Sequence, residues 1–257
     1  MTTIKNITLA FCIIAIASGC KKNSVSAIDE RFVDGALVKF GYFASRQFNP
    51  PVQLKIDNVR VSNNLTYAVS FPGGGLNMGG SNTNDYLDVT PGTRAVSISF
   101  VKIGTDIDSV VLYNGNLVFE KGIRHSVMFT DSAALKAFVI NDNTGLVIPS
   151  NNTTSSFKFF NGLMNMVGTG VAVDVYLNTN TTPTFSNVAY NTVTPYANML
   201  VGTTIIVLRA AGSLPTSTPL VSYSAAYAGG RVFNTIARGN VGLTGIRVPT
   251  VSVTTIR

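Results

Sequence analysis

The sequence contains no tryptophan, one histidine and only two cysteines among its 257 residues. Both cysteines, Cys12 and Cys20, lie close to the N-terminus, so the rest of the chain has no thiol for a disulfide, a thiolate metal site or a cysteine nucleophile. The single histidine, His125, has no second imidazole with which to share a metal ion. The absence of tryptophan removes the largest aromatic side chain that a sugar-stacking surface would use.

Long hydrophobic runs are also missing. The N-terminal apolar segment, 7–17, is too short to span a bilayer, which requires about 20 apolar residues. It follows a single positive charge at Lys5 and precedes small residues, which is the layout of a secretory signal. We therefore expect the protein to be exported.

The residues after this segment, Ala17-Ser18-Gly19-Cys20, resemble the lipobox of bacterial lipoprotein precursors. The resemblance implies that residues 1–19 are a removed signal peptide, that Cys20 is the lipid attachment site, and that 20–35 form a tether. Lipidation at Cys20 would make the membrane a partner and would place the protein in the cell envelope, at the outer membrane. Ala17 stands where leucine is usual, so the alternative is a secreted protein that is cut after Gly19 and keeps a free cysteine.

Composition and periodicity predict an all-β protein. Apolar and polar residues alternate in short segments, which is typical of half-buried strands, at 52–56, 95–100, 171–177 and 248–253. Clusters of Asn, Gly, Pro and Thr separate them, as expected for turns. The pair Asn114-Gly115 predicts a hairpin turn, because both residues tolerate positive φ angles.

The chain also repeats itself once. Tyr86, followed by Gly92 and a strand, corresponds to Tyr196, followed by Gly202 and a strand, and 38–40 corresponds to 157–159. Equivalent residues keep their order and are 107 to 119 positions apart, which indicates two homologous domains of sandwich size. We predict a first β-sandwich domain at 36–148, a linker at 149–156 and a second β-sandwich domain at 157–257.

The stretch from Asn187 to Tyr196, with Val201-Gly202-Thr203 and the following strand, resembles a domain of exported bacterial proteins catalogued only as a domain of unknown function. Such domains occur in tandem behind lipoprotein signals of the Bacteroidota type. The resemblance implies immunoglobulin-like or transthyretin-like sandwiches. It transfers no catalytic residue, because the matching residues form turns and strands.

Residues that could carry chemistry are few. We interpret His125 as an ordinary strand residue, and no Gly-x-Ser-x-Gly motif is present. Asp106 and Asp108 raise the question of a calcium site, but the ring of oxygen ligands that calcium needs is missing, so a solvated loop is favoured. The run from Gly73 to Gly80 lacks the lysine of a phosphate-binding loop and is either a mobile loop or a binding lip with Leu76 and Met78. No catalytic residue, cofactor or metal is predicted.

Charge is uneven along the chain. From 152 onward, six basic residues face the single acid Asp174, a net charge of +5. The arginines are spread over several strands, which favours weak attraction to acidic glycans or simple solvation over nucleic-acid binding. We therefore predict no nucleic-acid partner.

Two kinds of function remain, and neither is enzymatic. The first is a non-catalytic binding or accessory module whose loops recognise a glycan or another envelope protein. Four tyrosines could replace the missing tryptophan in a glycan site: Tyr67, Tyr86, Tyr190 and Tyr196. The alternative is a fimbria-like or adhesin-like structural subunit that assembles by strand exchange, with 246–256 as the donated strand.

Overall fold

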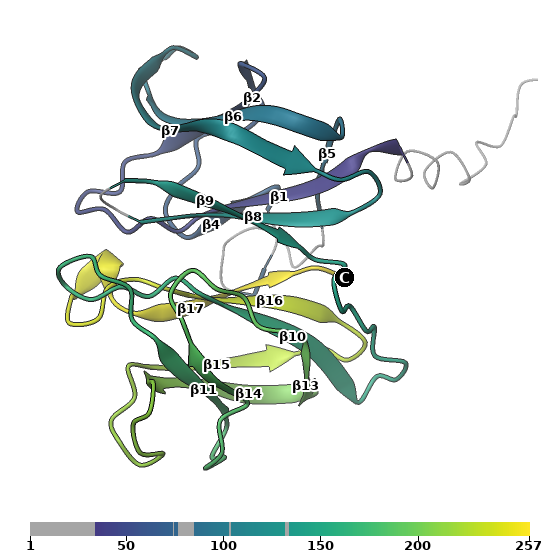
Figure 1. Cartoon of the computed structure of the whole chain (residues 1–257), viewed down its shortest axis with the longest axis vertical. Helices are drawn as coiled ribbons and strands as arrows, with labels where there is room; N and C mark the ends of the chain where they lie inside the picture. Colours follow the sequence, from purple (N-terminus) through teal and green to yellow (C-terminus); the bar gives the residue numbers. More distant parts are fainter. Residues whose placement is uncertain (1–33, 74, 77–84, 103, 132–133) are drawn as a thin grey trace, which may run out of the picture.

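The computed structural model describes residues 34–73, 75–76, 85–102, 104–131 and 134–257 (Figure 1). Its named elements are β-strands, apart from one short 3₁₀ turn, η1 (Gly245–Arg247). None of the described segments forms a helix that is long and apolar enough to cross a membrane. The predicted all-β fold is therefore confirmed.

The first nine strands form two sheets, which we call domain 1. The inner sheet has the order β4 (Val69–Phe71), β1 (Ala36–Tyr42), β8 (Arg124–Thr130) and β9 (Lys136–Asn141), and β5 (Leu87–Val89) also pairs with β1. The outer sheet has the order β3 (Val59–Arg60), β2 (Val52–Ile56), β6 (Gly92–Val101) and β7 (Asp108–Phe119). The sandwich core between them contains Phe40, Phe119 and Phe129.

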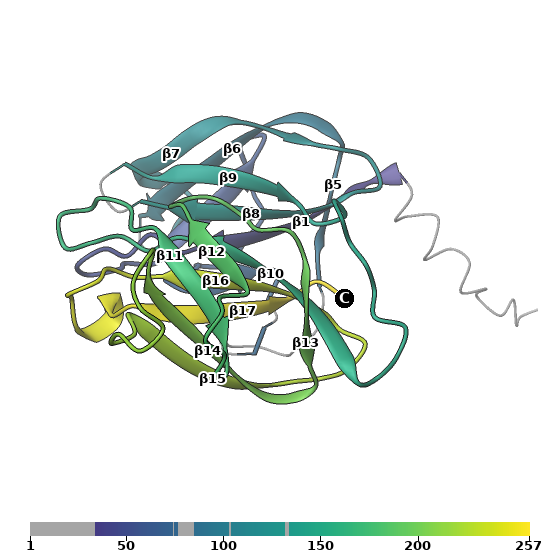
Figure 2. The same ribbon diagram turned by 60° about the horizontal axis from the view of Figure 1, so that its bottom comes forward.

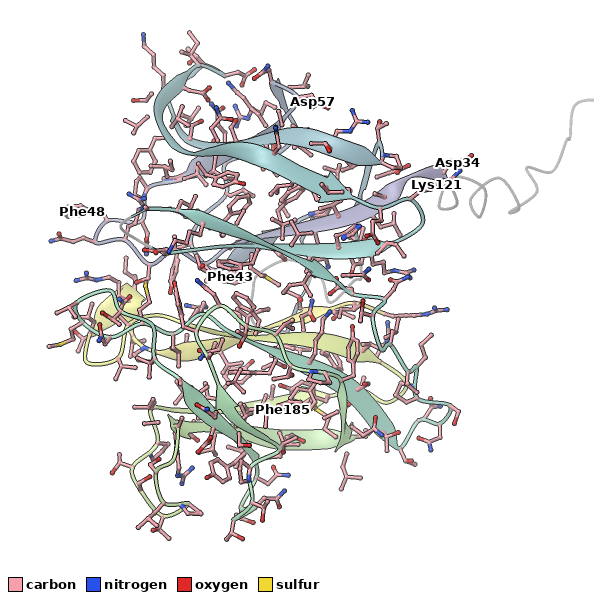
Figure 3. The ribbon with its side chains drawn as sticks, in the orientation of Figure 1. Asp34, Phe43, Phe48, Asp57, Lys121 and Phe185 are labelled. Carbon is pink, nitrogen blue, oxygen red and sulfur yellow. The ribbon has the colours of Figure 1, made fainter. Side chains whose placement is uncertain are left out.

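The remaining strands form domain 2 in the same way. Its inner sheet has the order β13 (Ala197–Leu200), β10 (Thr154–Asn161), β16 (Val232–Arg238) and β17 (Thr250–Thr255). Its outer sheet has the order β12 (Phe185–Val188), β11 (Val173–Leu177), β14 (Gly202–Ala210) and β15 (Val221–Tyr227). Phe185 lies between these sheets and packs on Phe157 (Figure 3).

The two domains stack so that their inner sheets face each other and their outer sheets lie on the outside (Figures 1 and 2). This stacking explains the burial of β1 and β10, in which almost every residue is buried on both faces. Phe40 and Phe159 point into their own sandwich cores, whereas Lys39, Lys158 and Phe160 lie on the faces where the domains meet. The alternating pattern is thus that of a strand with two different buried faces.

An apolar cluster and a polar cluster fill the space between the inner sheets. The apolar cluster consists of Phe43, Met128, Ile140, Phe160 and Ile236 (Phe43 is labelled in Figure 3). Its members come from both domains, so it holds the domains together without belonging to either sandwich core.

The polar cluster is centred on Asp142, which is fully buried and follows β9 directly. Lys158 of domain 2 forms an ion pair with it at 2.6 Å. Ser126 donates to the Asp142 carboxylate, and so does the Asn234 amide, at 3.1 Å. The Tyr196 hydroxyl donates to the Asp142 carbonyl oxygen at 2.8 Å. A buried carboxylate requires such partners, because its desolvation is costly.

Equivalent residues of the two domains make reciprocal contacts. Lys39 Nζ donates to the carbonyl of Thr255 at 3.2 Å, and Lys158 Nζ donates to the carbonyl of Asn141 at 3.3 Å. Asn141 and Thr255 hold the same place in their domains. Lys39 pairs with Ser126, and the residue before it, His125, pairs with Asn141. In the same way, Lys158 pairs with Asn234, and the residue before it, Phe233, pairs with Thr255. Such reciprocity is typical of a two-fold relation between two copies.

The repeat predicted from the sequence is also visible in backbone conformation. Gly92 and Gly202 begin the equivalent strands β6 and β14 with φ angles of 104° and 100°. A residue with a Cβ atom rarely adopts such angles, so both domains need glycine at this position.

Two predictions of local structure differ from the structure. Asn114 and Gly115 form no hairpin turn, because β7 continues through them and pairs with β6 over its whole length, with Gly115 opposite Val96. The apolar residues on both sides of the pair therefore belong to one strand. β10 begins at Thr154, so the last three residues of the predicted linker 149–156 are part of a strand.

Candidate functional site

The loops at one end of the molecule form the candidate site. In domain 1, β1 ends at Tyr42, β2 begins at Val52 and pairs there with Phe100, and β6 ends at Val101. The loop 43–51 and the β6–β7 connection therefore emerge at the same end of the sandwich. Figure 3 shows Phe48 at this end and Asp34, the first described residue, at the opposite end.

Three loops meet here, at 43–51 in domain 1 and at 162–170 and 239–249 in domain 2. Ser45 Oγ donates to the amide oxygen of Asn240 at 2.6 Å, and the Asn240 amide donates to the carbonyl of Asn165 at 3.1 Å. A backbone bond from Val241 to the carbonyl of Met164, at 2.7 Å, joins the two loops of domain 2. We call these three connected loops the loop end.

Large apolar side chains are exposed on the loop end. Phe48 is 83% exposed and Val167 is 84% exposed, each on a tight turn closed by an asparagine side chain. Other exposed apolar residues of these loops are Met166, Ile246 and Val248. A group of exposed apolar residues on loops that are fixed to one another marks a candidate contact surface.

Domain 1 has an open pocket of about 710 Å³, lined in part by Pro50 and Pro51 of the loop that carries Phe48. Its apolar wall contains Pro50, Pro51 and the half-buried ring of Phe100. Its polar rim contains Arg60, Asn64 and Asp106. We call it the Phe100 pocket.

Arg60 organises the polar rim. Its guanidinium donates to the carbonyl of Ser62 at 2.9 Å, to the Asn64 amide oxygen at 3.0 Å and to the Asp106 carboxylate at 2.5 Å. One side chain thus holds the two others in place, which a planar group with several N–H donors does well. A second cation, Arg46, lies over the Phe100 ring with its Cζ atom 5.9 Å from the ring centroid.

The two aspartates that raised the question of a calcium site have separate partners. Asp106 pairs with Arg60, and Asp108 pairs with Lys55 at 2.9 Å. Burial raises the pKa of Asp108, but hydrogen bonds from Ser99, Lys55 and Gln53 outweigh it and hold the pKa below its usual value. Among the residues described, no three His, Cys, Asp or Glu side chains come together as a metal site.

The glycine-rich run from Gly73 to Gly80 lies partly outside the described residues, and so does its Met78. Leu76 is described, and it packs against the core of domain 2. Its backbone N–H donates to the carbonyl of Val253 in β17 at 2.9 Å. Leu76 therefore makes a contact between the domains.

His125 lies in β8 and is almost fully buried. Its Nε2 atom accepts a hydrogen bond from the backbone N–H of Glu120 at 2.9 Å, and its ring packs against Phe119. Burial lowers the pKa of His125 below its ordinary value, although the charges of Asp142 and Glu120 oppose this. These contacts fit the prediction of an ordinary strand histidine.

The four tyrosines considered for a glycan site do not form one surface. Lys39 lies over the ring of Tyr86 at 5.0 Å, Lys158 lies over the ring of Tyr196 at 5.1 Å, and Arg238 lies over the ring of Tyr67 at 5.0 Å. Burial is the main cause that raises the pKa of Tyr86, Tyr190 and Tyr196. Tyr67 and Tyr196 reach across the contact between the domains, so the four tyrosines do not form a shared exposed platform.

Cys20, the predicted lipid attachment site, lies outside the described residues, as do the signal peptide 1–19 and most of the tether 20–35. The sites predicted from the sequence did not include Phe48, Arg60, Asn64 or Phe100. The turn at Asn49-Pro50-Pro51 was a signal for Phe48, since a large apolar residue directly before such a turn is expected to be exposed. No pattern along the chain pairs Arg60 with Asp106, because the two are 46 residues apart.

Comparisons with known proteins give little. No family model matches the chain, and no curated protein matches it. One similar solved structure is described as α-glucan recognition by family 41 carbohydrate-binding modules from streptococcal virulence factors, with 9% identity and a TM-score of 0.24 over 84% of this chain and 96% of that one. Another is a leucine-rich repeat protein from Bacteroides thetaiotaomicron, with 14% identity and a TM-score of 0.18 over 82% of this chain and 27% of that one. At these TM-scores neither likeness bears on the function of this chain.

Proposed function

We propose that the chain is a lipoprotein of the cell envelope, anchored at the outer membrane through Cys20, that acts as a non-catalytic binding or accessory module. The observation that carries this proposal is that the two ends of the molecule differ. Asp34, the first described residue, lies at one end, and the loop end with its exposed apolar residues and the Phe100 pocket lies at the other (Figure 3). A tether at one end leaves the opposite end free to meet a glycan or another envelope protein.

The two-domain body supports this role. The domains are joined by a buried ion pair, a buried apolar cluster and hydrogen bonds between their loops. Loops held on such a rigid scaffold suit recognition, because little conformational freedom is lost when a partner binds.

Assembly by strand exchange is the less favoured alternative. The C-terminal strand β17 pairs with β16 over its whole length and is buried in all but its first residue. Its carbonyl at Val253 is bound by Leu76 of domain 1. Donation of this strand would require these contacts to break.

The experiment is site-specific photocrosslinking on intact cells. A photoreactive amino acid at position 48 or 167, on the loop end, should give a discrete adduct with a glycan or an envelope protein. The same group at Val118, which is 58% exposed and pairs with Thr93 at the end of β6 opposite Val101, should not. A Cys20→Ser variant should leave the membrane fraction and lose the adduct.

A regular ladder of self-adducts would instead favour the structural subunit. Equal labelling from all three positions, or no adduct from any, would contradict a binding role for the loop end. Retention of the Cys20→Ser variant in the membrane fraction would contradict the lipid anchor.

A further inference from the structure

The Phe100 pocket combines an apolar wall with a polar rim. Pro50, Pro51 and Phe100 provide flat apolar surfaces, and Phe48 projects into solvent two residues before Pro50. The polar part of the lining consists of the guanidinium, amide and carboxylate groups of Arg60, Asn64 and Asp106. Small-molecule sites are typically built in this way, from a mainly apolar cavity with a few fixed polar groups.

The rim is fixed in position before any ligand arrives. The guanidinium of Arg60 binds both Asn64 and Asp106, and its own Nε is held by the carbonyl of Ser62. Asp106 uses one carboxylate oxygen for Arg60, and a carboxylate has a second oxygen that accepts hydrogen bonds. The Asn64 amide uses its oxygen for Arg60, and its NH₂ group is a donor. The rim therefore offers an acceptor and a donor beside each other.

Charge limits the class of ligand. The Arg60 cation is neutralised by Asp106 at the rim, and Arg46 lies over the face of the Phe100 ring. An anionic ligand would have to compete with Asp106 for Arg60. A neutral ligand with hydroxyl groups can bind the rim without breaking this ion pair, because hydroxyls both donate and accept hydrogen bonds.

We infer that the Phe100 pocket binds a neutral sugar unit of a glycan. A pyranose ring has an apolar face of C–H groups and a rim of hydroxyls, which match the apolar and the polar lining of the pocket. Pro50, Pro51 and the pocket side of Phe100 pack against the C–H face, Phe48 extends this apolar surface from the same loop, and Asp106 and Asn64 bind the hydroxyls. This inference rests on the proposed binding function and specifies its ligand.

The test uses the full-length protein in detergent, applied to an array of neutral glycans that includes α-glucan, β-glucan, mannan and galactan oligosaccharides, with polygalacturonate as the anionic comparison. At least one neutral glycan should bind. Phe48→Ser and Asp106→Asn should each weaken that binding about tenfold, the effect of roughly 1.4 kcal/mol. Both sites are exposed, so neither change should unfold the domain.

Two matched variants serve as controls. Leu214→Ser also removes an exposed apolar residue, 73% exposed, but from domain 2. Asp57→Asn also removes a carboxylate that pairs with arginine, here Arg94, at the other end of domain 1. Both should bind like the wild type, and thermal melts of all four variants should match that of the wild type.

Three results would overturn the inference: no neutral glycan binds, only polygalacturonate binds, or the bound glycan is insensitive to Phe48→Ser and Asp106→Asn. Photocrosslinking at position 48 separates this failure from failure of the proposed function. If a protein adduct forms there while no glycan on the array binds, the binding role stands and a sugar is the wrong ligand class. If both experiments are negative, the binding role itself is wrong.

Discussion

Lys39 and Lys158 are equivalent residues of the two domains, but their electrostatic surroundings differ. Lys158 lies 2.6 Å from the buried carboxylate of Asp142. Lys39 donates to a neutral carbonyl, that of Thr255. Burial lowers the pKa of Lys39 to about 8, although Asp85 and Asp142 oppose the shift. Lys158 thus neutralises the buried charge of Asp142, whereas Lys39 is itself a buried charge whose hydrogen bond goes to a neutral carbonyl.

Substitution of each lysine by methionine should therefore have unequal effects. Lys158→Met leaves Asp142 buried without its cation, so we expect the free energy of unfolding at pH 7 to fall by about 3 to 5 kcal/mol. Lys39→Met removes a charge that burial disfavours, so we expect a change within about 1 kcal/mol. Urea unfolding at pH 7 measures both. Equal losses would show that the two lysines contribute alike.

The comparison of the wild type with Lys39→Met also gives a pH test. The pKa of Lys39 is about 8 in the folded state, against 10.5 when unfolded, so between these values the unfolded chain binds more protons. The stability of the wild type should rise with pH over this window relative to Lys39→Met, since stability increases wherever the unfolded state binds more protons. A stability difference between the two proteins that stays constant from pH 8 to 10.5 would contradict the lowered pKa.

At the scale of the element, the strand β17 has one edge paired and the other covered. β16 pairs with one edge, and Gly75-Leu76 of domain 1 lie against the other, with the Leu76 N–H bound to Val253. A Cβ atom at Gly75 would lie 2.2 Å from the carbonyl oxygen of Val253, which is backbone and cannot move aside easily. This contact therefore depends on glycine.

Gly75→Ala should displace this cover and destabilise the protein by about 1 to 3 kcal/mol, the usual cost of overpacking. Hydrogen exchange should increase in β17. Gly73→Ala is the matched control, because nothing lies within 4 Å of its added Cβ atom, and it should change stability by about 1 kcal/mol or less. Unchanged exchange in β17 of Gly75→Ala would show that Leu76 does not protect this edge.

The strands themselves were predictable because their apolar residues alternate. Phe40 and Phe159 point into their sandwich cores, as apolar residues of such alternating strands do. The covering of the polar face was not predictable in this way, because Lys39 and Lys158 have the pattern of solvent-facing residues, yet both are buried between the domains. A period of two identifies two faces but does not tell what covers each of them.

Turns and the candidate site were less predictable for a related reason. Asn114-Gly115 has the local chemistry of a hairpin turn, but the ladder of pairs between β6 and β7 extends over it and determines its conformation. Asp106 was noticed as a possible ligand of a cation, whereas its actual partner, Arg60, comes from a distant strand. Contacts between residues far apart in the chain decide both cases, and a single sequence does not contain them.

At the scale of the whole molecule, the domains meet as two copies of a dimer would. The reciprocal lysine contacts join equivalent positions, and Tyr86 and Tyr196 lie against the lysines of their own domains in the same way. Asp142 breaks this symmetry, since its equivalent by strand pairing in domain 2 is Ile256. The charge of Lys158 is therefore balanced by Asp142, and the contact is specific for domain 1 against domain 2.

Because the contact is largely buried, the two domains should unfold together in one transition. Ile236 is fully buried in the apolar cluster between the domains and is not part of either sandwich core. Ile236→Asp would place a carboxylate there without partners, which is costly in a low-dielectric environment. We expect the domains to separate, with two calorimetric transitions and a larger radius of gyration in X-ray scattering.

Leu200→Asp is the control, since Leu200 lies in the same sheet but is 72% exposed, and this variant should keep a single transition and the wild-type radius. If Ile236→Asp also kept a single transition and the wild-type radius of gyration, the polar cluster around Asp142 and the loop contacts through Asn240 would suffice to hold the domains together. If Ile236→Asp lost all structure, the sandwich of domain 2 would depend on domain 1. Only separation with two intact transitions fits two self-sufficient sandwiches joined by a buried contact, the arrangement that holds the loops 43–51 and 239–249 together at one end.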